Sequence, residues 1–212
     1  MKVKICGIQS IQAAQAAEEN GADMVGFMFA DSSRKITPET AEAITDALGS
    51  GIQKTGVFVN TGLSEINRTI DQAGLDYVQL HGDESPAFAR AVNSKVIKAF
   101  SIDEGPTFKE MFEYPADFIL LDSRTETKRG GTGRKFDWSK AVNTDIDRRR
   151  LILAGGLNAG NINQAEMEVA PFMIDLSSGA ETNGVKDRNK IAEIMQIAKG
   201  VVMNGKDIPA AR

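Results

Sequence analysis

The sequence is poor in the residues that define several common classes of protein. Its 212 residues include one cysteine, one histidine and one tryptophan. A single cysteine excludes an intrachain disulfide framework, and a single histidine leaves no Cys/His cluster with the spacing of metal ligands. We therefore expect no bound metal. A serine hydrolase would need His81 as its base, and the G-x-S-x-G motif that surrounds such a serine is absent.

Long apolar runs and clusters of basic residues are also missing. No stretch approaches the roughly 18 apolar residues that cross a bilayer, and the N-terminus lacks the apolar core of a secretory signal. The net charge is -4, and the longest basic cluster, Arg148–Arg150, is interpreted as a solvated loop before a strand. The sequence therefore predicts a cytoplasmic protein that binds neither membranes nor nucleic acid.

The chain does contain a repeated pattern of short apolar segments and helix-like segments. The predicted strands are Val3–Gly7, Met24–Phe29, Thr55–Val59, Tyr77–Leu80, Val96–Phe100, Phe118–Asp122, Leu151–Ala154 and Phe172–Leu176. The predicted helices are Ile11–Asn20, Glu39–Leu48, Leu63–Ala73, Pro86–Ala91, Thr107–Phe112, Trp138–Val142, Asn158–Val169 and Asn189–Lys199. Eight strand–helix units favour an α/β protein whose parallel sheet closes into one (β/α)8 TIM barrel domain over residues 1–212, rather than an open, doubly wound sheet.

Residues able to do chemistry gather where the predicted strands end, which is where barrels of this kind hold their active sites. They are Cys6, Arg34, His81, Asp122, Gly155, Gly156, Asp175, Ser178 and Gly179. Cys6 is either a reactive thiol or only a small buried side chain. Arg34 and His81 could each contact a substrate or serve the structure alone. Asp122 ends an apolar run, which favours a paired carboxylate or an acid–base role.

Two glycine-bearing segments follow the seventh and eighth predicted strands. Barrels often hold a phosphate there, against backbone N–H groups and the N-terminus of a short extra helix. Gly155–Gly156 would let the backbone approach the phosphate, and Ser178–Glu181 could begin the helix; alternatively, the glycines only make tight turns. The glycine-rich segment 127–138 lacks the G-K-[ST] ending of a nucleotide loop and is predicted to act as a flap over the site.

Six segments share their order and spacing with one known family. They are Lys4–Ile8, Gln79–Glu84, Leu121–Ser123, Gly130–Gly133 with Phe136–Trp138, Ala154–Leu157 and Asp175–Glu181. Together they resemble the phosphoribosylanthranilate isomerase family of tryptophan biosynthesis. The likeness extends from the first predicted strand to the last.

This resemblance implies an Amadori rearrangement of N-(5-phosphoribosyl)anthranilate to a 1-deoxyribulose 5-phosphate, without a cofactor. It implies that Asp122 is the general acid that opens the ribose ring and Cys6 the general base that removes the C2 proton. It also implies that Arg34 faces the anthranilate carboxylate. The predicted substrate-binding residues are Arg34, His81, Asp175, Gly155, Gly156, Ser178 and Gly179. The expected partner is thus a small phosphosugar, bound by a monomer or a homodimer.

Two other functions remain open at this stage. The first is that of a related phosphosugar barrel, such as an epimerase or the isomerase of histidine biosynthesis. The histidine-pathway isomerase is expected to use two aspartates, so the presence of Cys6 in the position of the base disfavours it. A non-catalytic phosphate-binding barrel is the other, and it would tolerate the loss of Cys6 or Asp122. For catalysis, Asp122 must be protonated and Cys6 ionised near neutral pH, the reverse of their ordinary states. Burial would favour the neutral thiol of Cys6 and nearby positive charge would favour the thiolate, and the sequence does not indicate which effect is larger.

Overall fold

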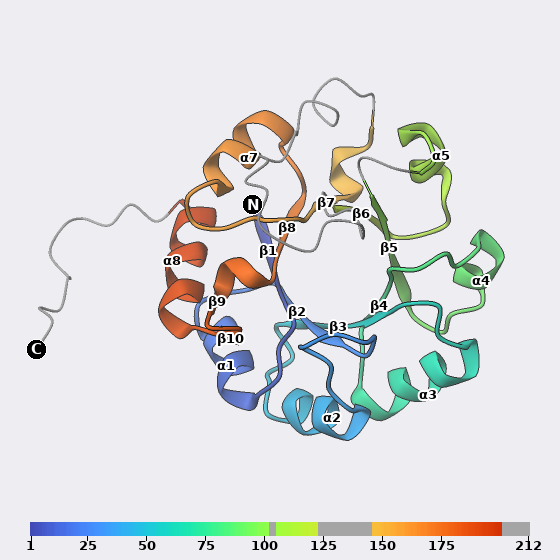
Figure 1. Ribbon diagram of the computed structural model, residues 1–212, viewed down its shortest axis with the longest axis horizontal. Coiled ribbons are helices and arrows are strands. Elements are labelled where there is room, and N and C mark those ends of the chain that lie inside the picture. Colours follow the sequence, from blue (N-terminus) through green and yellow to red (C-terminus); the bar gives the residue numbers. More distant parts are fainter. Residues whose placement is uncertain (102–104, 123–145, 201–212) are drawn as a thin grey trace, which may run out of the picture.

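A closed barrel of eight parallel strands forms the centre of the computed structural model, which describes residues 1–101, 105–122 and 146–200 (Figure 1). The strands are β1 (Lys2–Cys6), β2 (Met24–Met28), β3 (Gln53–Phe58), β4 (Tyr77–Leu80), β5 (Lys95–Ser101), β6 (Phe118–Asp122), β7 (Leu151–Leu153) and β8 (Met173–Leu176). Each strand pairs with the next, and β8 pairs with β1, with Lys4 opposite Asp175. The predicted closed barrel is confirmed.

Helices surround the barrel on its outer side (Figure 1). They are α1 (Ile11–Glu19), α2 (Pro38–Asp46), α3 (Leu63–Ala73), α4 (Pro86–Arg90), α5 (Phe108–Glu113), α7 (Ile162–Val169) and α8 (Arg188–Ala198). Most begin at a side chain that accepts a backbone N–H, as Ser10 does before α1 and Thr37 before α2. The predicted helix Trp138–Val142 and the segment 127–138 lie outside the described residues.

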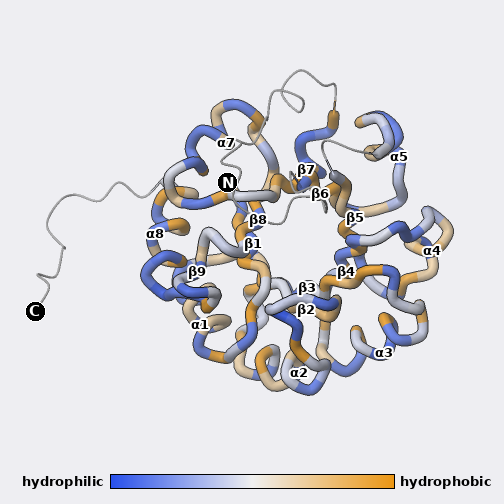
Figure 2. The backbone as a smooth tube through the Cα atoms, in the orientation of Figure 1, coloured by the Kyte–Doolittle hydropathy of each residue, from blue (hydrophilic) through white to orange (hydrophobic). Residues whose placement is uncertain are grey.

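Two layers of buried side chains hold the barrel together. The outer layer lies between strands and helices, and it joins Val3 and Ile5 of β1 to residues such as Ala14 of α1 and Ile194 of α8. The inner layer consists almost entirely of strand residues, among them Met24, Tyr77, Leu120, Ile152 and Met173, and it fills the lumen. Figure 2 shows the matching pattern, with hydrophobic and hydrophilic stretches alternating along the surrounding helices.

The segment after β8 differs from the prediction. A helix was expected to begin at Ser178–Glu181, but the chain forms a three-residue 3-10 turn, η2 (Ser178–Ala180), followed by an antiparallel hairpin of β9 (Glu181–Thr182) and β10 (Val185–Lys186). The reason lies in Asn183 and Gly184, which both have positive φ values of 52° and 81° and make a tight turn where a helix would continue. The hairpin brings Glu181 and Lys186 directly opposite each other.

The basic cluster Arg148–Arg150 also departs from the sequence interpretation. It forms a 3-10 turn, η1, in which Arg149 is exposed but Arg150 is partly buried. The Arg150 guanidinium donates to the carbonyl oxygens of Phe112 at 3.0 Å and Ala116 at 2.6 Å. Arg150 therefore ties the end of α5 to the start of β7, and the interpretation as a solvated loop was wrong for this residue.

Candidate active site

Asp122 and Asp175 both point into the barrel interior near the carboxyl ends of their strands. Side chains two residues apart on a strand share a face. Asp122 is two residues beyond Leu120 on β6, and Asp175 is two residues beyond Met173 on β8; Leu120 and Met173 both belong to the inner layer. The two carboxylates therefore face the lumen, above the apolar side chains that fill it.

A buried ion pair joins the first strand to the last. The Lys4 ammonium lies 3.1 Å from each of the two Asp175 carboxylate oxygens, and the Lys4 side chain is fully buried. Burial alone would lower the pKa of Lys4, but Asp175 and Cys6 outweigh it and raise that pKa, so the side chain stays charged. Because Lys4 faces the lumen, Cys6, two residues further along β1, faces it as well.

The Cys6 thiol lies against Lys4, over a glycine of the neighbouring strand. A Cβ atom placed on Gly26 would be 2.9 Å from Cys6 Sγ and 3.0 Å from Lys4 Nζ, so both atoms occupy the space that a larger residue would fill. Cys6 is only 5% exposed. Burial raises the pKa of the thiol, Lys4 and Lys186 lower it, and Asp175 raises it further. For the protein without ligand, burial thus outweighs the positive charges, and the thiol pKa lies above its ordinary value.

Arg34 is held by a carboxylate of the protein itself. Its Nε and Nη2 atoms donate to the two Glu181 carboxylate oxygens, both at 2.6 Å, in a bidentate pair. Glu181 also pairs with the buried Lys186. Burial would raise the pKa of Glu181, but the hydrogen bonds from Arg34 and Lys186 lower it to about 2. The guanidinium is therefore positioned by Glu181, beside the Gly7 backbone.

His81 connects the end of β4 to Asp122. Its Nε2 atom lies 3.8 Å from Asp122 Oδ2, and its Nδ1 atom lies 3.1 Å from the Gln79 amide nitrogen. Burial lowers the pKa of His81, while Asp122 and Asp175 oppose that shift. The Gln79 side-chain amide and the Asp122 carboxyl group thus stand on opposite nitrogens of the His81 ring.

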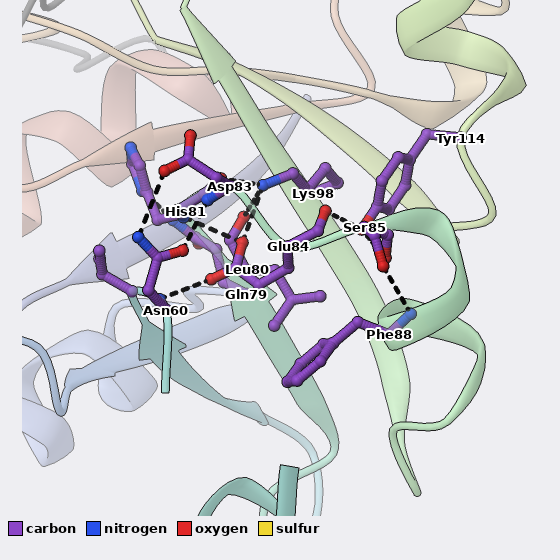
Figure 3. A network of polar contacts seen from close by, with 12 residues as sticks. Asn60, Gln79, Leu80, His81, Asp83, Glu84, Ser85, Phe88, Lys98 and Tyr114 are labelled. Atoms are coloured by element: carbon purple, nitrogen blue, oxygen red, sulfur yellow. Dashed lines mark hydrogen bonds and ion pairs between the residues drawn. The ribbon is translucent and has the colours of Figure 1, made fainter. Parts of the chain in front are cut away.

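A second buried ion pair fixes the segment that carries His81 (Figure 3). Lys98 of β5 lies 2.9 Å from Glu84, and it also donates to the Leu80 and Gly82 carbonyl oxygens. The Glu84 carboxylate accepts in turn from the backbone N–H groups of Asn60 at 2.9 Å and Gly82 at 3.0 Å.

Tyr114 completes this network by donating its hydroxyl proton to the Glu84 and Ser85 carbonyl oxygens, at 2.9 and 3.1 Å. Every polar group named in it has a partner within the described residues. The residues Gly82 to Ser85 are thus anchored, and the position of His81 is set by the chain that follows it.

The predicted phosphate segments lie close together. Gly155 and Gly156 have φ values of 88° and 66°, which side chains rarely adopt, so the backbone turns sharply at both residues. A Cβ atom on Gly179 would overlap the Leu157 carbonyl oxygen, so the segments after β7 and β8 are in contact through this glycine. Binding of a phosphate by these segments, including Ser178, stays a prediction.

One hollow of the molecule lies apart from the predicted site residues. A hollow of about 400 Å³ lies between the segment after β2 and helix α3, and Phe29, Ile36, Pro38, Phe58, Thr61 and Glu65 are among the residues that line it. None of the predicted site residues lines this hollow. In the described ranges, no group of three or more His, Cys, Asp or Glu side chains could hold a metal ion, and no helix is long and apolar enough to cross a membrane.

Sequence reasoning did not single out Lys4, Glu181 or Lys186 as residues of the site. Lys4 stands in an apolar strand, and a buried lysine there is a usable signal, because lysine is almost never fully buried without a partner. Glu181 and Lys186 carry no such signal, since their approach depends on the unpredicted hairpin. The facing of Cys6 and Asp122 across one cavity stays a prediction.

Comparison with known proteins gives one consistent result. The family described as N-(5'phosphoribosyl)anthranilate (PRA) isomerase matches residues 3–197. A protein of Listeria monocytogenes named N-(5'-phosphoribosyl)anthranilate isomerase is 43% identical over 201 residues, covering 95% of this chain and 100% of that protein. The solved phosphoribosyl anthranilate isomerase of Thermotoga maritima superposes with a TM-score of 0.85 at 38% identity, covering 95% and 100% of the two chains.

Two other solved structures add a ligand and an assembly. One is a phosphoribosyl anthranilate isomerase in complex with reduced 1-(o-carboxyphenylamino)-1-deoxyribulose 5-phosphate, and the other holds monomers of the dimeric enzyme of Thermotoga maritima. Each superposes with a TM-score of 0.79 at 36% identity, covering 95% of this chain and 100% of the other.

Proposed function

The chain belongs to the N-(5'-phosphoribosyl)anthranilate isomerase family, and on that premise we propose that Asp122 and Cys6 carry the reaction as general acid and general base. The substrate is the aminoaldose N-(5'-phosphoribosyl)anthranilate. The product is the ketose 1-(2-carboxyphenylamino)-1-deoxy-D-ribulose 5-phosphate, an intermediate of tryptophan biosynthesis.

Two proton transfers, one from Asp122 and one to Cys6, convert the substrate to the enolamine of this isomerisation. Protonated Asp122 gives its proton to the ring oxygen of the ribose, the C1–O bond breaks, and the nitrogen lone pair forms a Schiff base. The Cys6 thiolate then takes the proton from C2, which leaves an enolamine that tautomerises to the ketone. The ring oxygen and C2 are both bonded to C1 of one substrate, so the two groups must approach it within one site.

The observation that carries this proposal is the shared direction of the two side chains. Cys6 and Asp122 stand on β1 and β6, far apart in sequence, and both face the lumen near the carboxyl ends of their strands. His81 stands beside the proposed acid, with its Nε2 atom 3.8 Å from Asp122 Oδ2, and we assign it as a substrate contact. A non-catalytic phosphate-binding barrel would have no need for such an arrangement.

Arg34 and the glycine segments supply the binding groups for the two ends of the substrate. Glu181 occupies the Nε–Nη2 edge of the guanidinium, which leaves the Nη1–Nη2 edge to take the anthranilate carboxylate in a bidentate pair. Backbone N–H groups around Gly155, Gly156, Ser178 and Gly179 bind the phosphate. Asp175 accepts from a sugar hydroxyl while it remains paired with Lys4.

A solved relative bound to a reduced analogue of the phosphosugar product supports this assignment of the ligand class. The dimeric enzyme of Thermotoga maritima is compatible with a homodimer here, and the choice between monomer and homodimer stays a prediction. The cytoplasmic location expected from the sequence stays a prediction as well.

Turnover of substrate generated in situ tests the proposal directly. The loss of anthranilate fluorescence is followed for the wild type, Cys6→Ser and Asp122→Asn. We expect each variant to lose at least about two orders of magnitude in kcat, the usual contribution of a positioned acid or base. Asp71→Asn, which changes an exposed carboxylate on α3, is the matched control and should turn over like the wild type. Wild-type rates in both Cys6→Ser and Asp122→Asn would refute the mechanism.

A further inference from the structure

We propose that Lys4 is a positioning residue of this reaction: its buried ammonium stabilises the ionised form of Cys6 and so makes the thiol a base. The inference rests on the proposed function, in which Cys6 removes the C2 proton. Lys4 does not contact the substrate in this proposal, and it acts only through the sulfur beside it.

The position of Lys4 supports this role. The ammonium and the sulfur are both about 3 Å from the point where a Gly26 Cβ would lie, at 3.0 and 2.9 Å respectively. They come from one face of one strand, which fixes their relative position. The positive charge of Lys4 lowers the pKa of the thiol, and the negative charge of a thiolate raises that of Lys4. Gly26 is the residue that allows this approach, because any side chain there would push the two atoms away.

The charged side chains around the Cys6 thiol have a net positive charge. The groups that face Cys6 are Lys4 from its own strand, Asp175 from β8, Lys186 from the hairpin and Arg34 from the segment after β2, with Glu181 paired to the last two. Three cations against two carboxylates leave a single unbalanced positive charge. A thiolate at Cys6 balances this charge, so the cluster works against burial, which favours the neutral thiol.

A purely structural role for Lys4 is the alternative. Lys4 and Asp175 pair across the β1–β8 contact, and such a pair could serve only to close the barrel. The two roles predict different shifts in the pKa of Cys6 when Lys4 and Asp175 are replaced. If Lys4 acts on the thiol, then removing Lys4 raises the pKa of Cys6, and neutralising Asp175 lowers it, because Asp175 both repels the thiolate and shares the ammonium. A structural role predicts no opposed pair of shifts.

Titration of the single cysteine measures these shifts without any substrate. The ultraviolet absorbance of the thiolate is recorded against pH and corrected with Cys6→Ser in the same background, so the difference reports one group. The proteins compared are the wild type, Asp175→Asn and the double variant Lys4→Met with Asp175→Asn. The double variant leaves no unpaired buried charge, which protects its folding.

We expect the titration midpoint of Asp175→Asn to lie below that of the wild type. The midpoint of the double variant should lie at least one pH unit above that of Asp175→Asn, which means about tenfold less thiolate near neutral pH. In turnover, the kcat of the double variant should fall by the same factor relative to Asp175→Asn, with the gap closing as the pH rises and KM unchanged. Iodoacetamide is a small neutral reagent that reacts with the thiolate. Near neutral pH it should alkylate Asp175→Asn faster than either the wild type or the double variant.

The second buried pair of the barrel provides the control. Lys98→Met with Glu84→Gln removes an equally buried lysine–carboxylate pair whose contacts do not include Cys6. Its thiol midpoint should equal that of the wild type. Equal midpoints in Asp175→Asn and the double variant, or an equal upward shift in the control, would overturn the role of Lys4. Absence of turnover by the wild type would instead overturn the proposed function, since the titration uses no substrate.

Discussion

The barrel contains two buried lysine–carboxylate pairs that use the same chemistry for different ends. The named bonds of Lys98 and Glu84 run to each other and to backbone groups of Asn60, Leu80 and Gly82, where β3 and β4 end. Lys4 and Asp175 pair equally closely, but the Lys4 ammonium also faces a titratable sulfur.

The difference between the pairs lies in their neighbours and not in their burial. The Lys98 and Glu84 side chains are 4% and 2% exposed, and those of Lys4 and Asp175 are 0% and 9% exposed. The partners of Lys98 other than Glu84 are carbonyl oxygens, which cannot change their charge, and its effect on the pKa of His81 comes after those of burial, Asp122, Asp175 and Lys4. We therefore expect this pair mainly to hold the chain. The thiol beside Lys4 can change its charge, so this pair can also tune a reaction.

The largest expected effect comes from breaking one pair at a single residue. Lys98→Met leaves the Glu84 carboxylate buried without its cation, and we expect the free energy of unfolding to fall by about 3–5 kcal/mol. Urea unfolding followed by circular dichroism measures it. Lys98→Met with Glu84→Gln should recover the larger part of the loss. A single variant as stable as the wild type would show that the pair does not hold the segment.

A glycine packs beside each pair, Gly82 beside Lys98–Glu84 and Gly26 beside Lys4–Asp175, and replacing each glycine tests whether the pairs differ in their effect on Cys6. A Cβ atom on Gly82 would overlap the Asn60 side chain and lie 2.8 Å from the Asn60 backbone nitrogen, and one on Gly26 would press on Lys4 and Cys6. Gly82→Ala and Gly26→Ala should each lose about 1–3 kcal/mol of stability through overpacking.

Only Gly26→Ala should also change the alkylation rate of Cys6, because a Cβ on Gly26 meets the Cys6 sulfur, whereas the atoms nearest a Cβ on Gly82 belong to Asn60. Thermal unfolding and alkylation by iodoacetamide, measured on both variants, separate the two effects. Equal changes of alkylation rate in both would contradict the distinction between the pairs.

A smaller loss is expected where Tyr114 supports the structural pair. Tyr114→Phe removes the hydroxyl that donates to the Glu84 and Ser85 carbonyl oxygens. The cost should be about 1 kcal/mol, as for a typical buried hydrogen bond, and the thiol titration should not move. Denaturant midpoints of the variant and the wild type give the number; an altered thiol midpoint would mean that the two regions communicate.

The two regions should also lose stability at opposite ends of the pH scale. The pKa of Glu181 is lowered from 4.5 to about 2, so its contribution is full above pH 4.5 and disappears as the pH falls toward 2. Burial raises the pKa of Tyr114 from 10.0 to about 12, so its contribution is full below pH 10 and disappears as the pH rises through 12. Unfolding free energies against pH should therefore flatten at the acid end in Glu181→Gln and at the alkaline end in Tyr114→Phe. Unchanged curves would refute these assignments.

Much of the fold could be predicted from local signals. Helix α3 was predicted with its observed bounds, because apolar residues recur at helical spacing from Leu63 to Ala73 and Gly74 ends it with a φ of 59°. Strand β6 was also predicted with its observed bounds, since four apolar residues precede Asp122. Helix α7 begins at Ile162, later than the predicted Asn158, because the residues after Asn158 form turns in which Asn158 bonds Gly160 and Asn161.

The candidate site was predictable where a residue type stands out at a strand end, as Cys6, Asp122 and His81 do. It was not predictable where function depends on distant partners. Nothing local to Lys4 indicates Asp175, which stands 171 residues further along the chain, and nothing local to Arg34 indicates Glu181. Such pairs become visible only when the barrel closes and the hairpin forms.

The pairing of β1 with β8 has a consequence for the growing polypeptide. The ribosome extends the chain at about 5–20 residues per second. Strand β1 is therefore made several seconds or more before β8, its partner in the closed barrel. During this interval Lys4 and Cys6 have no Asp175 beside them. The electrostatic surroundings of the thiol are therefore created late, by a contact of high sequence separation that is slow to form. A nascent chain that ends before β8 should hold Lys4 beside the thiol but lack Asp175 and Lys186, two of the charges that set the pKa of the thiol in the folded protein.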